Sequence, residues 1–235
     1  MKLRAKWLAL ACLLLPLTLR EVAADNSGAT SGDAPAGQLT VDDLRSIFER
    51  LVTASDKGDH KAFVRFSRLY PSLYQQAYLE AGANLPKTVT AMIPALDQWL
   101  LEKAKGGSPT AQYWMGERTK VLQQFGAPPP AMADVATWYR ASAEQGFAPA
   151  QNSLGQVLGF FPEYAKEPFE AEKWLYQAAK QGDEAAGDNL LQAIEIDHQR
   201  AQYKPDAEIG NWLQQRADAG DAQAKTLVEK LAAPN

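Results

Sequence analysis

The sequence predicts an all-α fold made of repeated pairs of helices, with about four and a half repeats. Three observations lead to this prediction: tryptophan recurs at a nearly constant interval, glycine stands eight residues after each of these tryptophans, and alanine stands five and twelve residues after each. Chance does not readily produce agreement at four positions in four copies. Repeats of roughly 20 to 50 residues are typical of solenoids, in which stacked units bury apolar faces that neither helix could bury alone.

The repeated tryptophans are separated by 39, 36 and 38 residues. They are Trp99, Trp138, Trp174 and Trp212, and the glycines that follow them are Gly107, Gly146, Gly182 and Gly220. We expect these eight residues to be structural anchors of the repeats, with the indole rings packed in the core instead of forming a platform for a ligand. Gly58 and Ala62 repeat the junction once more, with Arg50 in place of the tryptophan, as a divergent fifth copy.

Residues 1–24 are predicted to be a signal peptide. They begin with basic residues, continue through the apolar run Trp7 to Leu19 and end in small residues at Ala23 and Ala24. The run of about 13 residues is shorter than the roughly 20 that a membrane-spanning helix needs, which favours cleavage after Ala24. Two alternatives stay open: a retained N-terminal anchor, and a lipoprotein signal with Cys12 as the lipid-bearing residue, although Cys12 lies inside the apolar run.

Cleavage changes the composition of the chain. The whole chain has 24 Lys and Arg against 28 Asp and Glu, whereas the part after Ala24 has 20 against 27, a net charge of −7. The single cysteine is removed too, so the product holds itself together by packing and not by a disulfide. An acidic chain argues against nucleic acid as a partner, and no later stretch reaches the length of a membrane span, so we expect no stable membrane insertion.

Three regions follow the signal peptide. Residues 25–38 are rich in Gly, Ala, Ser and Pro and are predicted to be a flexible leader. Residues 39–95 are predicted to hold a divergent helical half-repeat and an insertion from Leu69 to Pro86, because Gly58 and Gly107 are 49 residues apart against 36 to 39 elsewhere. Residues 96–235 are predicted to hold the repeats.

The copy around Gly146 shows the physics of one repeat. Trp138 and Tyr139 follow Val135 at spacings of three and four, which is the period of a helix that buries one face. Gly146 then ends that helix, because glycine readily takes a positive φ after the last turn. A second helical pattern runs from Ala150 to Leu158. Each repeat is therefore expected to be a helix, a tight glycine turn and a second helix.

This copy resembles the Sel1-like repeat, which is related to the tetratricopeptide repeat. The family pattern is W-Y-x-x-A-A-x-Q-G-x-A-x-A-Q-x-x-L-G, and the chain reads Trp138-Tyr139-x-x-Ser142-Ala143-x-Gln145-Gly146-x-Ala148-x-Ala150-Gln151-x-x-Leu154-Gly155. The resemblance covers about residues 96 to 230, with weaker matches in the other copies. It implies a right-handed superhelix in which the helix after each glycine turn lines the concave side.

The chain departs from the family pattern in its loops, where a short Gly-x-Gly-Val-x-x-Asp link is usual. The segments in its place are Phe125 to Pro130, Phe160 to Tyr164 and His198 to Pro205. Recognition is often placed in such loops, and the aromatic side chains of Phe160, Phe161 and Tyr164 beside a proline suit a stiff contact surface. The alternative is that these rings fold back onto the helix ends.

The implied concave face gives a second candidate partner-binding surface. Its members are the exposed positions beside the Leu-Gly site of each second helix, and they are Arg68, Tyr113, Glu117, Lys120, Asn152, Gln156, Asp188, Gln192 and Glu195. The set is polar with one aromatic residue, which suits a protein or peptide better than a lipid or a small apolar ligand. The alternative is an ordinary solvated helix face.

No pattern for catalysis, a metal or a cofactor stands out. The chain after Ala24 has no cysteine nucleophile, no H-E-x-x-H helix, no G-x-S-x-G elbow and no phosphate loop. Its two histidines, His60 and His198, are expected to be solvated. Acidic pairs such as Glu170 with Glu172 carry no specific signal in so acidic a chain. We expect no enzyme, no cofactor and no metal site.

The resemblance implies a protein-binding role in an extracytoplasmic compartment, a bacterial periplasm. Exported Sel1-like proteins act as scaffolds for envelope machinery or as immunity proteins. A short, acidic chain with no catalytic set favours an immunity protein that neutralises a secreted antibacterial effector, for instance a type VI phospholipase, and acidity suits a basic target. The first alternative is a scaffold for a cell-envelope or secretion complex, and the second is an unrecognised hydrolase.

Overall fold

The computed structural model describes residues 40–82, 88–124, 131–201 and 203–233. The predicted signal peptide at 1–24 and leader at 25–38 lie outside the described residues, as does the predicted loop Phe125 to Pro130. The described elements are helices, with no β-strand among them, so the prediction of an all-α fold is confirmed. None of the described helices is both long and apolar enough to cross a membrane.

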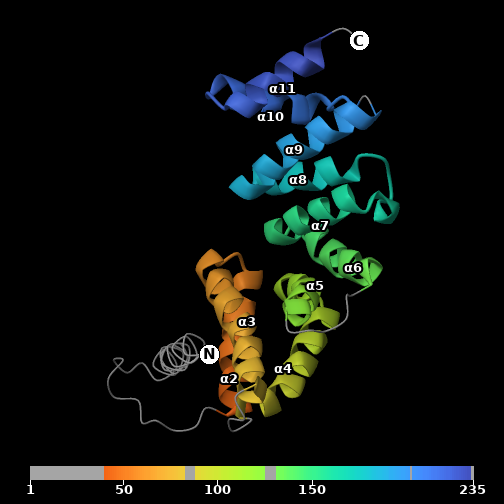
Figure 1. Cartoon of the computed structure of the whole chain (residues 1–235). Helices are drawn as coiled ribbons and strands as arrows, with labels where there is room; N and C mark the ends of the chain where they lie inside the picture. The colour runs from red at the N-terminus through yellow and green to blue at the C-terminus, as the bar shows by residue number, and fades with distance from the viewer. Residues whose placement is uncertain (1–39, 83–87, 125–130, 202, 234–235) are drawn as a thin grey trace, which may run out of the picture. The chain divides into compact units, whose positions relative to one another are not determined.

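The chain divides into two compact units, which are described separately (Figure 1). The N-terminal unit comprises the residues up to Trp114 together with Arg118–Pro129, and the C-terminal unit comprises Met115–Glu117 together with Pro130–Asn235. The helices of the first are α2 (Val41–Asp56), α3 (His60–Gly82), α4 (Thr88–Lys105) and most of α5 (Pro109–Gln124). Those of the second are α6 (Met132–Ala143), α7 (Ala148–Phe160), η1 (Pro162–Tyr164), α8 (Glu170–Lys180), α9 (Glu184–Ala201), α10 (Ala207–Asp218) and α11 (Ala222–Ala232).

A glycine in the left-handed region joins the two helices of each successive pair. Gly58, Gly107, Gly146, Gly182 and Gly220 have φ between +85° and +100°, a region that other residues rarely adopt. At Gly146 the backbone N–H donates to the carbonyl three residues earlier at 2.9 Å, which closes the last turn of α6. The positive φ predicted at Gly146 is found there. At Gly58 the turn joins α2 to α3, in the region where a divergent half-repeat is predicted.

Alanine occupies one buried position near the start of each second helix. The side chains are at most 5% exposed, and the residues are Ala62, Ala111, Ala150, Ala186 and Ala224. A methyl group at this position lets the second helix approach the first closely, whereas a larger side chain would push the pair apart. The periodic alanines of the sequence therefore mark helix contacts.

Aromatic rings fill the core of the N-terminal unit. Phe66 on α3 is fully buried and meets Phe48 on α2 edge to face, with ring centroids 5.1 Å apart. It also stacks on Tyr70 at 5.5 Å and meets Trp114 at 5.8 Å. Trp99 contacts the same cluster through Phe48 at 6.0 Å. Rings in these geometries gain attraction beyond the burial of their area.

The insertion predicted from Leu69 to Pro86 is largely helical in the described residues. Helix α3 continues through Pro71 and ends at Gly82. Proline removes one helical hydrogen bond and usually ends or kinks a helix. Here Tyr70 and Tyr74 flank Pro71 and lie buried in the core, so tertiary packing overrides the local preference. The extra residues lengthen a helix instead of a loop.

Aliphatic side chains dominate the core of the C-terminal unit. The buried cluster consists of Leu175, Leu190, Leu191, Ile194, Tyr203, Ile209, Leu213, Ala224 and Leu227. Helix α7 packs on α8 and α9, and α9 packs on α11. Helix α9 runs to Ala201, so the loop predicted from His198 begins later than expected. A Cβ added at Gly155 would lie 2.5 Å from Leu175 Cγ, so this glycine permits the close approach of α7 and α8.

Candidate protein-binding loop

The segment from Phe160 to Phe169, which we call the aromatic loop, carries the most exposed large apolar side chain of the described residues. Phe160 ends α7 and is 80% exposed, and Phe161 is 37% exposed. Tyr164 is half-buried, with its ring centroid 6.3 Å from that of Phe161. The alternative that all three rings fold back onto the helix ends is therefore wrong for Phe160.

Local backbone geometry directs the chain around this loop. Pro162 begins the short helix η1, which suits a residue with a fixed φ and no N–H to satisfy. At the far end of the loop, Phe169 has a φ of +57°. This left-handed conformation is unfavourable for any residue other than glycine. The ring of Phe169 packs against Tyr203 with centroids 4.5 Å apart, and this buried contact holds the strained residue in place.

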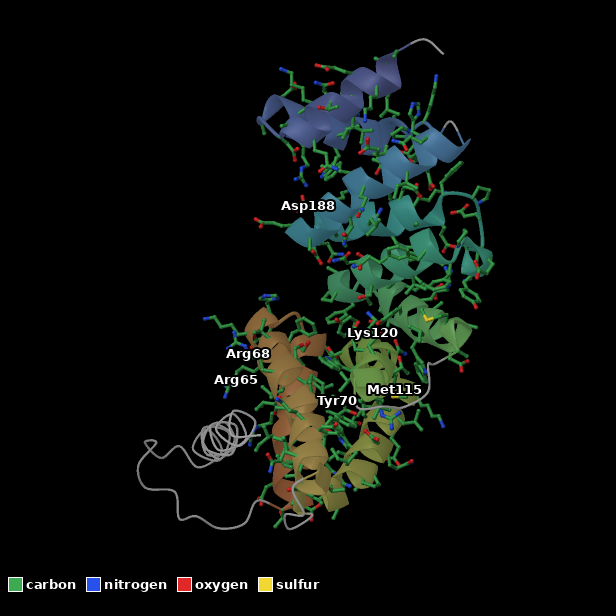
Figure 2. All side chains as sticks on the ribbon, viewed as in Figure 1. Arg65, Arg68, Tyr70, Met115, Lys120 and Asp188 are labelled. Carbon is green, nitrogen blue, oxygen red and sulfur yellow. The ribbon has the colours of Figure 1, made fainter. Side chains whose placement is uncertain are left out.

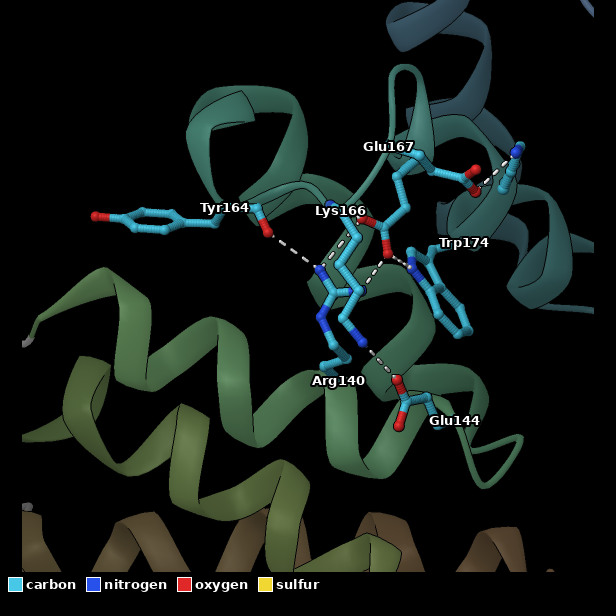
Figure 3. A network of polar contacts seen from close by, with 8 residues as sticks. Arg140, Glu144, Tyr164, Lys166, Glu167 and Trp174 are labelled. Carbon is cyan, nitrogen blue, oxygen red and sulfur yellow. Dashed lines mark hydrogen bonds and ion pairs between the residues drawn. The ribbon is translucent and has the colours of Figure 1, made fainter.

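A polar network ties the loop to α6 and α8 (Figure 3). Arg140 on α6 forms an ion pair with Glu170 at the start of α8, and both side chains are nearly buried. Arg140 also donates to the carbonyl of Tyr164 at 3.1 Å, while the backbone N–H of Lys166 donates to Glu170 at 2.6 Å. The indole N–H of Trp174 donates to the same carboxylate at 2.9 Å. The loop is thus fixed at two points along its length.

The electrostatics of this network keep it charged. Burial by itself would raise the pKa of Glu170, but the hydrogen bonds from Arg140, Trp174 and the Lys166 backbone outweigh it and lower the pKa to about 2. The outer ion pairs are exposed: Lys166 with Glu144 at 3.2 Å and Lys173 with Glu167 at 2.7 Å. Exposed pairs contribute little, so the buried pair is the one that positions the loop.

The predicted concave residues of the N-terminal unit are partly exposed (Figure 2). Arg68 on α3 and Lys120 on α5 are exposed, whereas Tyr113 is half-buried and meets Phe63 with ring centroids 5.7 Å apart. Glu117, which belongs to the C-terminal unit, accepts a hydrogen bond from the hydroxyl of Tyr139.

The predicted concave residues of the C-terminal unit mostly tie helices together. Asn152 on α7 accepts hydrogen bonds from Asn189 on α9 at 2.9 Å and from Gln156 at 3.0 Å. Two ion pairs also join neighbouring helices: Asp188 pairs with Arg216, and Glu195 pairs with Lys230. Gln192 is exposed. Most of these groups have partners within the fold, so the aromatic loop is the stronger of the two predicted contact surfaces.

The four repeated tryptophans differ in burial. Trp99 is 5% exposed and donates its indole N–H to Glu49 at 3.1 Å. Trp138, Trp174 and Trp212 are half-buried, and the guanidinium of Arg216 lies 5.3 Å from the Trp212 ring. The burial predicted for these rings is therefore complete only at Trp99, while Trp174 and Trp212 also contact the polar side chains of Glu170 and Arg216.

Sequence reasoning missed a pocket beside the aromatic loop, which we call the acidic pocket. Its volume is about 350 Å³, and it is lined by Leu158, Gly159, Pro162, Ala165, Lys166, Glu167, Pro168, Phe169, Glu170, Ala171, Glu172 and Asp197. Glu172 is fully buried. The sequence held one signal for it: Glu172 stands three residues before Leu175, on the buried face of α8, where a charge is unusual.

The comparisons with known proteins add no relative. No protein-family model and no curated protein matches this chain. The resemblance to the Sel1-like repeat therefore rests on the repeated residues and on the helix pairs that they form. Among the described residues, no group of three or more His, Cys, Asp or Glu side chains could hold a metal ion.

Proposed function

We propose that this chain is a periplasmic protein that acts by binding another protein, and that its partner is a secreted antibacterial effector which it neutralises. The observation that carries the proposal is the aromatic loop, where Phe160 projects 80% exposed from a segment anchored by a buried ion pair. An exposed aromatic ring on a fixed segment needs little ordering on association, and aromatic residues supply much of the binding energy at interfaces.

The proposed partner presents a basic surface to the C-terminal unit. Residues 130–235 contain nine Lys and Arg against sixteen Asp and Glu, so this part of the chain has a strong negative charge. A negative surface accelerates encounter with a basic partner and disfavours acidic ones. A type VI effector such as a phospholipase is the proposed example. A component of a cell-envelope or secretion complex, bound by the chain as a scaffold, is the alternative partner.

The finer architecture belongs to the same proposal. We propose that the helix pairs are about four and a half Sel1-like repeats wound into a right-handed superhelix, with the second helix of each pair on the concave side. Two observations support it: the five glycine turns with positive φ, and the direct packing of second helices, α7 on α9 and α9 on α11.

The test uses the chain purified from periplasm and the secreted product of the gene next to its own. We expect the chain to bind that product and to restore growth when both are directed to the periplasm. Phe160→Ala should weaken binding at least about tenfold, since exposed aromatic anchors carry much of an interface's energy. The thermal unfolding temperature should not change, because Phe160 buries little in the free chain.

Tyr78→Ala is the matched control, because it removes an aromatic ring that is 56% exposed from α3 in the other unit. It should bind as tightly as the unchanged chain. If Phe160→Ala also binds unchanged, the aromatic loop is not the interface. If the chain neither binds the neighbouring product nor protects against it, the immunity role is wrong, and specific binding of an envelope-assembly protein would support the scaffold.

A further inference from the structure

Two of the four carboxyl groups that line the acidic pocket, those of Glu172 and Asp197, form no ion pair with a basic side chain that the structure describes. Glu167 pairs with Lys173 and Glu170 pairs with Arg140. Glu172 has no such pair with any basic side chain of the described residues, and both of its carboxyl oxygens are buried without a donor from the described chain. A buried carboxyl group without a donor is unusual in a folded protein, since such groups normally find a partner.

The group that faces Glu172 is itself acidic. Asp197 on α9 lines the same pocket and is half-buried. Burial raises the pKa of Glu172 to about 8, and the neighbouring Asp197 carboxyl adds to the effect. Tyr203, from the segment before α10, lies close enough to interact with both carboxyl groups of this pair and with Asp206, and burial raises the Tyr203 pKa as well. The remaining charged groups of the pocket are the paired Lys166, Glu167 and Glu170.

Part of the lining of the acidic pocket is apolar. Leu158 lies in the last turn of α7, Pro162 and Pro168 belong to the aromatic loop, and Phe169 also lines the pocket. Pockets of a few hundred Å³ with apolar walls and a few polar groups suit organic groups that have one charged end. A short alkyl stem against these walls would bring a charged end to Glu172 and Asp197, as the stems of Lys and Arg allow.

We propose that the acidic pocket binds an organic cation, a primary ammonium or guanidinium group on a short alkyl stem, through the carboxyl groups of Glu172 and Asp197. The cation comes either from a Lys or Arg side chain of a protein partner or from a free amine. On binding, the carboxyl O–H bond of Glu172 breaks and its proton leaves to solvent, while the ammonium N–H groups donate to the carboxylates. One positive charge thus replaces another.

This exchange makes binding depend on pH. Because the pKa of Glu172 is about 8, about 1% of its carboxyl groups are ionised at pH 6 and about nine-tenths at pH 9. The apparent affinity scales with the fraction of protein in the competent state. Binding of n-butylammonium should therefore be at least about tenfold tighter at pH 9 than at pH 6, although the cation itself stays charged at both.

The experiment titrates the full chain with n-butylammonium chloride and follows backbone amide resonances by NMR. We expect saturable shifts at Phe169, Glu172 and Asp197, no such shifts with n-butanol, and none with potassium chloride at equal ionic strength. Glu172→Gln should weaken binding at least about tenfold and remove its pH dependence. Asp197→Asn should also weaken binding. This second variant keeps the test possible if Glu172→Gln does not fold.

Glu184→Gln is the control, since this acid on α9 is exposed and lies outside the pocket lining. It should bind n-butylammonium as the unchanged chain does. The proposal is overturned if n-butylammonium gives no saturable shifts at these residues, if potassium gives the same shifts, or if both pocket variants bind unchanged. The same titration with a short Lys-containing peptide separates the two sources of the cation. If the peptide binds in the acidic pocket, the cation is a side chain of a protein partner. If the peptide does not bind while n-butylammonium does, the cation is a free amine.

The n-butylammonium titration and the partner-binding test of Phe160→Ala can succeed or fail independently of each other. Loss of partner binding in Phe160→Ala together with no n-butylammonium binding would support the protein-binding role and reject the cation site. Binding of n-butylammonium by a chain that recognises no effector would support the cation site and reject the immunity role. Glu172 does not contribute to the loop network shown in Figure 3, so each variant tests one proposal.

Discussion

The two units share helix pairs and glycine turns but differ in core and in charge. Residues 40–129 contain eleven Lys and Arg against nine Asp and Glu, while residues 130–235 contain nine against sixteen. The first core is built from stacked rings around Phe66, the second from leucine and isoleucine around Leu190. One repeated pattern therefore supports two kinds of packing, because it fixes the small residues at the helix contacts and leaves the large ones free to vary.

The units also bury their charges differently. In the N-terminal unit Asp97 accepts hydrogen bonds from the hydroxyls of Tyr70 and Tyr74 and pairs with Arg118, so several donors share one carboxylate. In the C-terminal unit Arg140 is the only side-chain cation among the described residues that pairs with Glu170. Glu170 also keeps two further donors, the Trp174 indole and the Lys166 backbone N–H, so the difference between the two carboxylates is burial. The side chains of Arg140 and Glu170 are 12% and 7% exposed, against 27% and 16% for Arg118 and Asp97.

The largest expected effect tests the aromatic core. Phe66→Ala should lower the free energy of unfolding by about 4 kcal/mol, because it leaves a large cavity that the surrounding aromatic rings cannot move in to fill. Leu190→Ala, at an equally buried position of the aliphatic core, should cost about 3 kcal/mol. Guanidinium chloride unfolding followed by circular dichroism measures both. Equal near-ultraviolet signals in the two variants would contradict the distinction, since only Phe66→Ala should loosen aromatic packing.

The next effect tests the buried charges. Arg140→Ala should cost about 3 kcal/mol, because it leaves the Glu170 carboxylate buried without its cation. Arg118→Ala should cost about 1 kcal/mol, because its pair with Asp97 is more exposed than the Arg140–Glu170 pair, so water can solvate the carboxylate that is left. Guanidinium chloride unfolding of both variants at pH 7 measures the two costs. A cost for Arg118→Ala as large as that for Arg140→Ala would show that the difference in burial between the two ion pairs does not matter.

A third prediction concerns pH and is confined to the C-terminal unit. Burial raises the pKa of Glu172 to about 8, above its ordinary 4.5, so the stability that its protonated form provides is complete below pH 4.5 and is lost as pH rises through 8. Glu172→Gln cannot ionise and should be more stable than the unchanged chain at pH 9, by on the order of 2 kcal/mol. Little difference is expected at pH 4.5. Thermal unfolding at the two pH values measures it, with Glu184→Gln as the control.

The smallest effect tests the exposed ion pairs. Lys173→Ala removes the partner of Glu167 at the end of the aromatic loop, where both side chains are about half exposed. The expected cost is below about 0.5 kcal/mol, because solvent and salt screen such pairs. A cost above 1 kcal/mol in chemical unfolding would mean that the outer pairs hold the loop as firmly as Arg140 does.

Much of the fold could be predicted from spacing alone. The glycines and alanines recur where helices turn and touch, and these are the positions where backbone conformation and close contact allow few residue types. The half-repeat and the insertion were harder to predict, since Arg50 replaces the tryptophan and Pro71 suggests a break in the helix. Packing between helices determines the structure of that region, where α3 continues through Pro71. Local rules do not contain that information.

The candidate site could be predicted only in part. Phe160 and Phe161 could be singled out as aromatics in an unusual link, but Arg140 and Glu170 meet across 30 residues with no local signal. The acidic pocket arises from Glu172 and Asp197, which come together only when α8 packs on α9. The chain has so many acids that a pair of them carries no signal until the fold brings them together.

The glycine turns also bear on where the chain can begin to fold. Each turn is closed by hydrogen bonds between residues three to five apart, such as Gly182 to Ala179 and Asp183 to Ala178. Contacts this short in sequence close rapidly and cost little chain entropy. We therefore expect helix hairpins to form locally at each of the five turns, so that folding can begin at more than one point of the chain.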